Sequence, residues 1–149
     1  MINLNSNAVI CRPSGQVFDF VSTPENAVGW HYGTLAASTL SEGTPSKGTF
    51  FRTIGHWMGR RNLSTFEVTE YEPGQKYGFK SLSGPLSSQT SYSLGIGDNG
   101  CTKIKVSIQA DGANFFQMDE GILEEKMQMQ LKEDLTMLKA LLEAKSFAE

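Results

Sequence analysis

Chemically versatile residues cluster in one short stretch of the chain. Residues 49–62, TFFRTIGHWMGRRN, place His56 beside Trp57 and just before Arg60 and Arg61. A histidine near two arginines suits acid–base catalysis or the binding of an anionic group. A general acid or base also needs an orienting partner and a substrate within hydrogen-bond reach. The function of this stretch therefore depends on whether it forms a site or only two strands joined by a turn.

The side-chain pattern of the stretch favours two strands. Every second residue from Phe50 to His56 shares one face of a strand, whereas Phe51 and Trp57 share the other face. Gly59 lies where a hairpin would turn. We therefore expect His56 to point outward and Phe51 and Trp57 to point into the core. The alternative is that His56 reaches the mouth of a cavity.

The segment from about Asp119 to Ala144 predicts a long helix. It contains no proline, and Gly121 is its last glycine. Roughly 25 residues at 1.5 Å each give a helix near 40 Å long. Acidic residues crowd its start, where the helix dipole favours negative charge. An apolar stripe follows the 3.6-residue period; it consists of Leu123, Met127, Leu131, Leu138, Leu141 and Leu142.

Three further residues are candidates for a site. Asp134 falls inside the apolar stripe, where a carboxylate must be paired or have a raised pKa. We expect a hydrogen bond to a serine, threonine or tyrosine of the sheet, with a functional contact in a cavity as the alternative. Trp30 is expected to anchor the core at one end of a cavity. His31 has no visible partner and is expected to be an exposed loop residue.

Other chemical classes find little support in the sequence. Two histidines and two dispersed cysteines, none at ligand spacing, argue against a zinc site. No serine or cysteine elbow of a nucleophilic triad is recognisable. Residues 95–100, GIGDNG, have no following helix and so do not form a phosphate loop. We therefore predict neither a metal nor a cofactor.

Composition limits the class of protein. The 149 residues suffice for one domain with a hydrophobic core, and 39% apolar with 19% charged residues are typical of a globular protein. The net charge of −3 gives no electrostatic footprint for nucleic acid or an anionic membrane. No segment is apolar enough over about 20 residues to insert stably into a bilayer.

The two cysteines and the first residues bear on location. Cys11 and Cys101 lie far apart in the sequence and do not form a disulfide framework. The start of the chain, MINLNSNAVICRP, lacks the basic and apolar regions of a signal peptide. We therefore expect a cytoplasmic protein with reduced thiols.

The order of elements indicates the fold class. An apolar strand at residues 2–11 is followed by two short helices, for which Ser14 and Thr23 are the expected N-caps. Alternation and turn residues then predict six strands; these are residues 34–41, 47–57, 62–71, 75–82, 88–96 and 101–110. The long helix covers one face of the resulting antiparallel sheet. A strongly curved sheet of about seven strands wrapped around one helix leaves a space between them.

The same residues carry a family resemblance. The chain resembles the START-like, helix-grip superfamily (SRPBCC), within its polyketide cyclase/dehydrase-type branch. The segments that carry the resemblance are PSGQVFDFV (13–21), TPEN (23–26), Gly48-Thr49, VTEYEP (68–73), Gly100-Cys101-Thr102 and DLTMLKALLE (134–143). They span nearly the whole chain, which implies one α+β helix-grip domain over residues 1–149.

The resemblance implies a cavity between sheet and helix for lipids, sterols, polyketides or other apolar molecules, and it carries no universal catalytic motif. We expect ten residues to line this cavity; they are Phe51, Trp57, Phe66, Val68, Tyr77, Phe79, Tyr92, Leu94, Met127 and Leu131. The hydroxyls of Tyr77 and Tyr92 are candidates to orient a ligand. Arg60 is a weaker candidate for a ligand carboxylate, and Phe115-Phe116 for a lid or a plug.

The sequence is compatible with three functions. A binding protein or carrier predicts nearly all apolar walls and a hydrophobic small molecule as partner. A cyclase- or dehydratase-type enzyme predicts at least two polar groups that converge in the cavity, with a tyrosine, a histidine or Asp134 as acid or base. An interaction module, with the long helix or a sheet edge as its contact surface, predicts a filled core and an exposed apolar patch. The oligomeric state is a separate open question, with a homodimer as a candidate.

Overall fold

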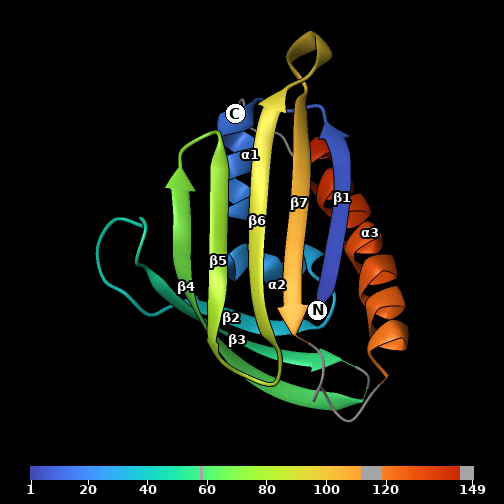
Figure 1. The fold of residues 1–149 in the computed structure, drawn as a ribbon. Coiled ribbons are helices and arrows are strands. Elements are labelled where there is room, and N and C mark those ends of the chain that lie inside the picture. Colours follow the sequence, from blue (N-terminus) through green and yellow to red (C-terminus); the bar gives the residue numbers. More distant parts are fainter. Residues whose placement is uncertain (58, 112–118, 145–149) are drawn as a thin grey trace.

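The computed structural model describes residues 1–57, 59–111 and 119–144, with only the backbone for Trp57. Figure 1 shows a curved sheet with helices α1 and α2 behind it and α3 beside β1. The strands are β1 (Ile2–Ile10), β2 (Thr34–Thr39), β3 (Phe50–Trp57), β4 (Arg60–Glu72), β5 (Lys76–Ser83), β6 (Ser87–Ile96) and β7 (Thr102–Asp111). The helices are α1 (Ser14–Val21), α2 (Ala27–Trp30) and α3 (Glu120–Ala144), with 3-10 turns η1 (Pro24–Asn26) and η2 (Asp98–Gly100).

The described residues form one antiparallel sheet of seven strands in the order β1-β7-β6-β5-β4-β3-β2. Neighbours along the chain from β2 to β7 are therefore neighbours in the sheet. The exception is β1, which pairs with β7 from Ile2 opposite Ala110 to Ile10 opposite Thr102. The predicted strands are confirmed in kind and order, and their ends differ by at most a few residues.

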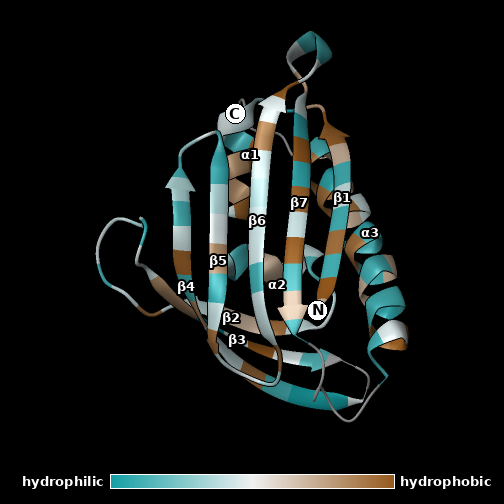
Figure 2. Cartoon of the chain, viewed as in Figure 1, coloured by the Kyte–Doolittle hydropathy of each residue, from teal (hydrophilic) through white to brown (hydrophobic). Residues whose placement is uncertain are grey.

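Alternation along the strands separates a core face from a solvent face. In β7, Ile104 and Val106 are buried, whereas Lys103 and Lys105 are exposed. Figure 2 shows the resulting bands of hydrophobic and hydrophilic residues along β1 and β7. This is the pattern of an antiparallel sheet with one covered face, as expected from the sequence.

The sheet bends where its register shifts. The register of strand pairing shifts between Thr34 and Ala36 in the β2–β3 pair and between Val68 and Glu70 in the β4–β5 pair. A bulge adds a residue to one strand, which bends that strand and increases its twist. In Figure 1, β2 and β3 cross beneath the upright strands β5, β6 and β7. This curvature creates the concave face that the helices cover.

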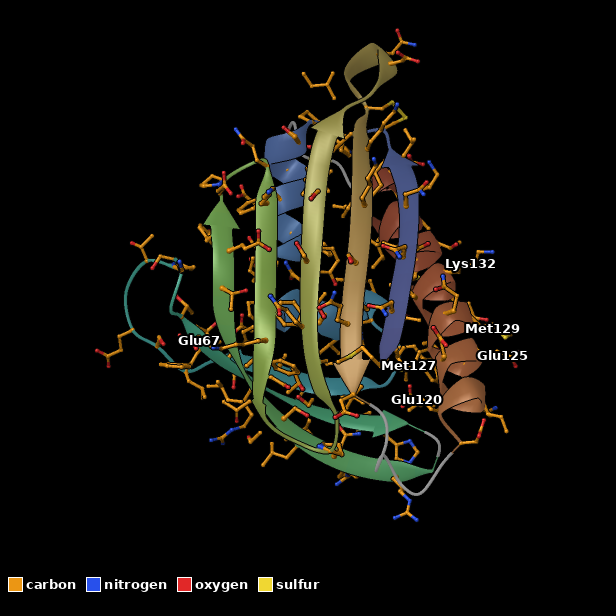
Figure 3. The ribbon with its side chains drawn as sticks, in the orientation of Figure 1. Glu67, Glu120, Glu125, Met127, Met129 and Lys132 are labelled. Carbon is orange, nitrogen blue, oxygen red and sulfur yellow. A yellow bond between two sulfur atoms is a disulfide. The ribbon has the colours of Figure 1, made fainter. Side chains whose placement is uncertain are left out.

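Helix α3 lays its apolar stripe against the sheet. Asp119 caps its start, because the Asp119 carboxylate accepts a hydrogen bond of 3.0 Å from the backbone N–H of Ile122. The buried residues are Leu123, Leu131, Asp134, Leu135, Leu138 and Leu142, and Met127 and Leu141 are half-buried. Figure 3 shows Met127 pointing toward the sheet, while Glu125 and Met129 point away. The predicted stripe is confirmed, with Leu135 as an addition.

The expected caps of the short helices are wrong. Helix α1 begins with Ser14 itself, and Pro13 stands before it without a capping side chain. Thr23 precedes η1 but makes no side-chain cap, since its hydroxyl donates to the backbone carbonyl of Asp19 at 2.7 Å. Fixed backbone angles at Pro13 and Pro24 therefore start these turns instead of capping hydrogen bonds.

The expectation of reduced thiols is also wrong, because a disulfide joins Cys11 to Cys101. The reason lies in the register of β1 and β7. Ile10 stands opposite Thr102, so Cys11 and Cys101 are the next residues at the same end of the pair. Residues 90 positions apart in the sequence thus become direct neighbours.

The arrangement is the α+β helix-grip fold that the family resemblance of the sequence implies. Two short helices follow β1, and the long α3 closes the chain against the curved sheet (Figure 1). Among the described residues, no helix has the length and apolar character needed to cross a membrane. The predicted lid or plug at Phe115-Phe116 lies outside the described residues.

Candidate functional site

A cavity of about 230 Å³ lies between α3, the segment after α2, and the concave face of the sheet. We call it the main cavity. Its apolar wall includes Leu4, Phe66, Phe79, Leu86, Ile108 and Leu131. Hydroxyl-bearing side chains from four strands and the segment after α2 also line it; these are Tyr32, Thr34, Thr53, Ser64, Ser88, Thr90 and Tyr92. The main cavity is therefore amphipathic and not uniformly apolar.

Two further hollows lie in the described part of the chain, and the first of them adjoins the main cavity. The inner chamber, about 110 Å³, is walled by aromatic side chains that include Phe51, Tyr77 and Tyr92. The outer pocket, about 230 Å³, lies among α1, η1, β2, β4 and β5. Its lining includes two carboxylates, Asp19 and Glu25.

Most of the ten predicted lining residues meet one of these hollows. Phe66, Phe79, Tyr92, Met127 and Leu131 line the main cavity. Phe51 and Tyr77 line the inner chamber, and Val68 lines the outer pocket. Leu94 lines none of the three and is a half-buried residue packed against the core. The side chain of Trp57 lies outside the described part of the structure.

The aromatic side chains of the inner chamber hold one another in place. Phe51 stacks on Phe66 with ring centroids 5.1 Å apart, and Phe79 meets Phe66 edge-on at 5.3 Å. Tyr77 stacks on Tyr92 at 6.2 Å. Such contacts add to the stability gained from burial and keep the rings in fixed orientations. The chamber wall is therefore preformed.

Burial keeps two tyrosine hydroxyls neutral. The pKa values of Tyr77 and Tyr92 lie well above the ordinary tyrosine value, chiefly because burial disfavours the charged phenolate. Both side chains therefore offer a hydroxyl that can donate or accept a hydrogen bond at any physiological pH.

Asp134 forms the centre of a polar cluster in the main cavity. It is buried, and its Oδ1 accepts hydrogen bonds from the backbone N–H of Tyr32 at 3.0 Å and from the Gln130 amide at 2.9 Å. Its Oδ2 lies 3.6 Å from His31 Nε2. The prediction of a buried, paired carboxylate is thus confirmed. The expected partner is wrong, because the segment after α2 and Gln130 of α3 supply the partners and the sheet does not.

The environment of Asp134 acts on its pKa in both directions. Burial raises the pKa of the carboxyl above its ordinary value. The His31 imidazole and the hydrogen bonds from Tyr32 and Gln130 oppose this by favouring the charged form. The carboxylate is therefore held by its partners against the cost of burial.

His31 is the main correction to the predicted site. Its side chain is about half exposed, but it has partners on both ring nitrogens. Nε2 faces Asp134, and Nδ1 lies 3.0 Å from the hydroxyl of Thr34. With the ring proton on Nε2, which faces Asp134, His31 Nδ1 accepts a hydrogen bond from the Thr34 hydroxyl. His31 also lines the main cavity and the inner chamber, so it is not an isolated loop residue.

Trp30 is buried and lies between the cluster and the aromatic wall, as predicted for a core anchor. Its ring meets His31 edge-on at 5.8 Å and Tyr92 at 6.4 Å. Its indole Nε1 is buried and has no hydrogen-bond partner among the described residues. A buried donor without an acceptor is uncommon and is often found near functional sites.

His56 and Arg60, the candidate residues of the stretch 49–62, lie outside the three hollows. His56 is exposed, stands opposite Arg61 in the β3–β4 hairpin and lines none of the three hollows. Arg60 is exposed as well and is not part of these linings. Gly59, with φ of 77°, makes the hairpin turn. The interpretation as two strands and a turn is confirmed.

The serine and threonine side chains of the main cavity are not among the lining residues predicted from the sequence, although the sequence contains a signal for them. Ser88 and Thr90 precede Tyr92 at intervals of two on β6, so they share the face of a residue that was assigned to the cavity. Thr53 follows Phe51 on β3 in the same way. Within the described ranges, no group of three or more histidine, cysteine, aspartate or glutamate residues is placed to hold a metal ion.

Several solved structures share this fold. A START superfamily protein from Mycobacterium smegmatis superposes with a TM-score of 0.83 at 10% identity, covering 96% of this chain and 98% of that one. The Zhui aromatase/cyclase from Streptomyces sp. R1128 gives 0.79 at 14% identity, with 95% and 93% covered. A conserved protein from Geobacillus kaustophilus gives 0.78 at 12% identity, with 95% of each chain covered. At these identities the likeness concerns the fold alone.

Sequence comparison is more specific about the family. No curated protein sequence gives a significant match. Residues 1–143, almost the entire chain, match the model of the family described as polyketide cyclase/dehydrase and lipid transport. The order of elements, the helix-grip fold and this match agree with the resemblance carried by the sequence segments. The chain therefore belongs to the polyketide cyclase/dehydrase and lipid transport family.

Proposed function

We propose that this domain binds an amphipathic small molecule, lipid-, sterol- or polyketide-like, between the sheet and α3. The apolar body of the ligand occupies the main cavity and the inner chamber. A polar group of the ligand lies near the cluster of His31 and Asp134. The family description, which names polyketides and lipids, supports this class of ligand.

The observation that carries the proposal is the composition of the main cavity. Apolar side chains such as Phe79 and Leu131 form one part of its wall, and the polar cluster around Asp134 forms another. A ligand site is usually a mostly apolar hollow with a few placed polar groups that orient the ligand. A carrier with nearly all apolar walls fits less well.

A cavity-blocking variant tests the proposal. Thr53 lines both the main cavity and the inner chamber, so Thr53→Phe is expected to fill them with a ring. Arg52→Phe adds the same ring on the exposed face of β3 and serves as the matched control. A ligand at a hundred times its dissociation constant stabilises a protein by about 2.7 kcal/mol. Wild type and Arg52→Phe should show this stabilisation, and Thr53→Phe should not.

The readouts are thermal unfolding with representative fatty acids, sterols and aromatic polyketides, and native mass spectrometry of protein isolated from its own host. A retained apolar molecule that Thr53→Phe loses supports the proposal. If none of these probes stabilises the wild type and no molecule is retained, the proposal is wrong.

A second candidate function is acid–base catalysis on a ketone-bearing substrate. The observation that favours it is the contact between His31 and Asp134 within the main cavity. A histidine oriented by a carboxylate is a common general base, and the enzyme hypothesis requires two converging polar groups of this kind. The base would remove a proton from the carbon next to the ketone, which is the first step of an aldol-type cyclisation.

Hydrogen–deuterium exchange at that carbon tests the enzyme hypothesis. Benzoylacetone serves as the probe, and NMR follows the loss of its proton signal. His31→Gln is expected to slow the exchange about 100-fold or more, since general bases contribute 10²- to 10⁴-fold. His56→Gln changes the other histidine of the chain, which is exposed and outside the cavity, and should have no effect. Equal rates in wild type and His31→Gln would exclude this base.

Two predictions from the sequence accompany the proposal. We propose that residues 1–149 act as one domain, which the family match over residues 1–143 supports. The cytoplasm is the location expected from the sequence. The Cys11–Cys101 disulfide weighs against it, because cytosolic thiols are usually kept reduced.

A further inference from the structure

The three hollows are arranged in series. The main cavity and the inner chamber share several lining residues, including Trp30, Phe66 and Tyr92. The inner chamber and the outer pocket share only two, Pro24 and Tyr77. The main cavity and the outer pocket share none. A molecule that enters through the main cavity would therefore pass the inner chamber before it meets Pro24 and Tyr77.

Pro24 and Tyr77 separate the inner chamber from the outer pocket, and Tyr77 is the larger of the two side chains. Its side chain is buried, with an exposed fraction of 3%. Phe18 meets its ring edge-on at 6.3 Å, Tyr71 does so at 6.3 Å, and Tyr92 stacks on it at 6.2 Å. Rings on several sides leave little room for the tyrosine to rotate. The wall between inner chamber and outer pocket is therefore rigid.

The two sides of the wall differ in polarity. The inner chamber has a mainly aromatic and aliphatic lining, with His31, Thr34 and Thr53 on the side shared with the main cavity, and it contains no carboxylate. The outer pocket carries the carboxylates of Asp19 and Glu25 with several hydroxyl groups. Glu25 already accepts a hydrogen bond of 2.7 Å from the backbone N–H of Thr39. An apolar chain end gains free energy in the inner chamber and gains little beyond it.

We propose that Tyr77 determines the length of the ligand by ending its apolar binding path at the inner chamber. The inference rests on the proposed binding function and makes it more specific. The ligand class is a molecule whose apolar part reaches from the main cavity to Tyr77 and no farther. Its polar group stays in the main cavity, near the cluster of His31 and Asp134.

Primary alkanols from hexanol to tetradecanol provide a graded probe. Each methylene that enters an apolar chamber strengthens binding about fourfold. In the wild type, affinity should rise by this factor per carbon and then stop rising at one chain length. In Tyr77→Ala the rise should continue for several more carbons. Isothermal titration calorimetry measures the affinities.

Three further variants define what the ring does. Tyr77→Phe keeps the ring and should keep the wild-type limit. Tyr77→Val removes the ring but stays apolar, and it replaces Tyr77→Ala if the alanine variant fails to fold. Leu94→Ala is the matched control, since Leu94 is a half-buried core residue that lines none of the three hollows. Its length limit should equal that of the wild type.

The outcomes separate this inference from the proposed function. If no alkanol binds the wild type while other cavity ligands do, or if affinity rises without a limit, Tyr77 does not end the path. If folded Tyr77→Ala and Tyr77→Val keep the wild-type limit, or Leu94→Ala shifts it equally, the inference is also wrong. If no apolar molecule of any kind binds, the proposed function itself fails.

Discussion

Asp134 illustrates what a sequence pattern reveals about one residue. The 3.6-residue period placed its carboxylate on the buried face of a helix, and the structure confirms this. The period contains no information about what faces that side. The partner proved to be His31, which comes from a short segment after α2 more than a hundred positions earlier. The period of a helix predicts on which side of the helix a side chain lies, whereas the tertiary fold determines which residue it contacts.

The raised pKa of Asp134 predicts how stability depends on pH. A carboxyl whose pKa is higher in the folded than in the unfolded state binds its proton more tightly when folded. Stability from this group is therefore greatest below the unfolded pKa of about 4 and decreases as pH rises through the folded pKa. Relative to Asp134→Asn, the wild type should lose free energy of unfolding across this interval.

Urea denaturation of both proteins at a series of pH values measures this difference, in which the titration of other groups largely cancels. In the His31→Gln background the decrease should extend to higher pH, because His31 lowers the pKa of Asp134. A difference that stays constant, or that grows with pH, would show that burial does not dominate at Asp134.

At the scale of elements, strands and the long helix were predictable, but their spatial relations were only partly so. Alternation in β7 and turn residues such as Gly59 and Gly74 marked strands and hairpins, since these are local properties. The pairing of β1 with β7 is not local and has no signature in either strand. The expectation of reduced thiols failed for this reason, because it treated Cys11 and Cys101 as distant.

The disulfide should stabilise the fold by tying the ends of β1 and β7. In the unfolded chain it closes a loop over a separation of 90 residues, which corresponds to about 4.6 kcal/mol from loop entropy. Reduction, or Cys11→Ser with Cys101→Ser, should lower the free energy of unfolding by up to this amount. Urea denaturation with and without reductant measures the change.

The double serine variant is the control, since reductant should not affect it. Thiol titration of protein alkylated during lysis of its host gives an independent answer. Freely reactive thiols in that sample would contradict the disulfide and agree with a cytoplasmic location. Their absence until reductant is added would support the disulfide.

At the scale of the whole molecule, the curvature of the sheet predicts a hollow beneath the long helix. It does not predict that the space is divided into a main cavity, an inner chamber and an outer pocket. A curved sheet around a helix leaves space, but the remaining volume depends on how each side chain packs. Predicted lining residues were chosen as apolar members of the concave face. That choice found Phe66, Phe79 and Leu131 and missed Thr53, Thr90 and the polar cluster. Leu94 met the same criterion but packs against the core.

The contacts of β1 have a consequence for how the chain reaches its native state. Besides pairing with β7, β1 and the residues just after it are bound to α3. Lys139 donates to the Val9 carbonyl at 2.6 Å, Gln128 to that of Asn5 at 3.0 Å, and Arg12 to that of Leu142 at 2.8 Å. During synthesis, β1 emerges from the ribosome long before either partner exists. Its apolar residues must therefore wait without their final contacts until the end of α3 has been made, which gives chaperones a window in which to bind.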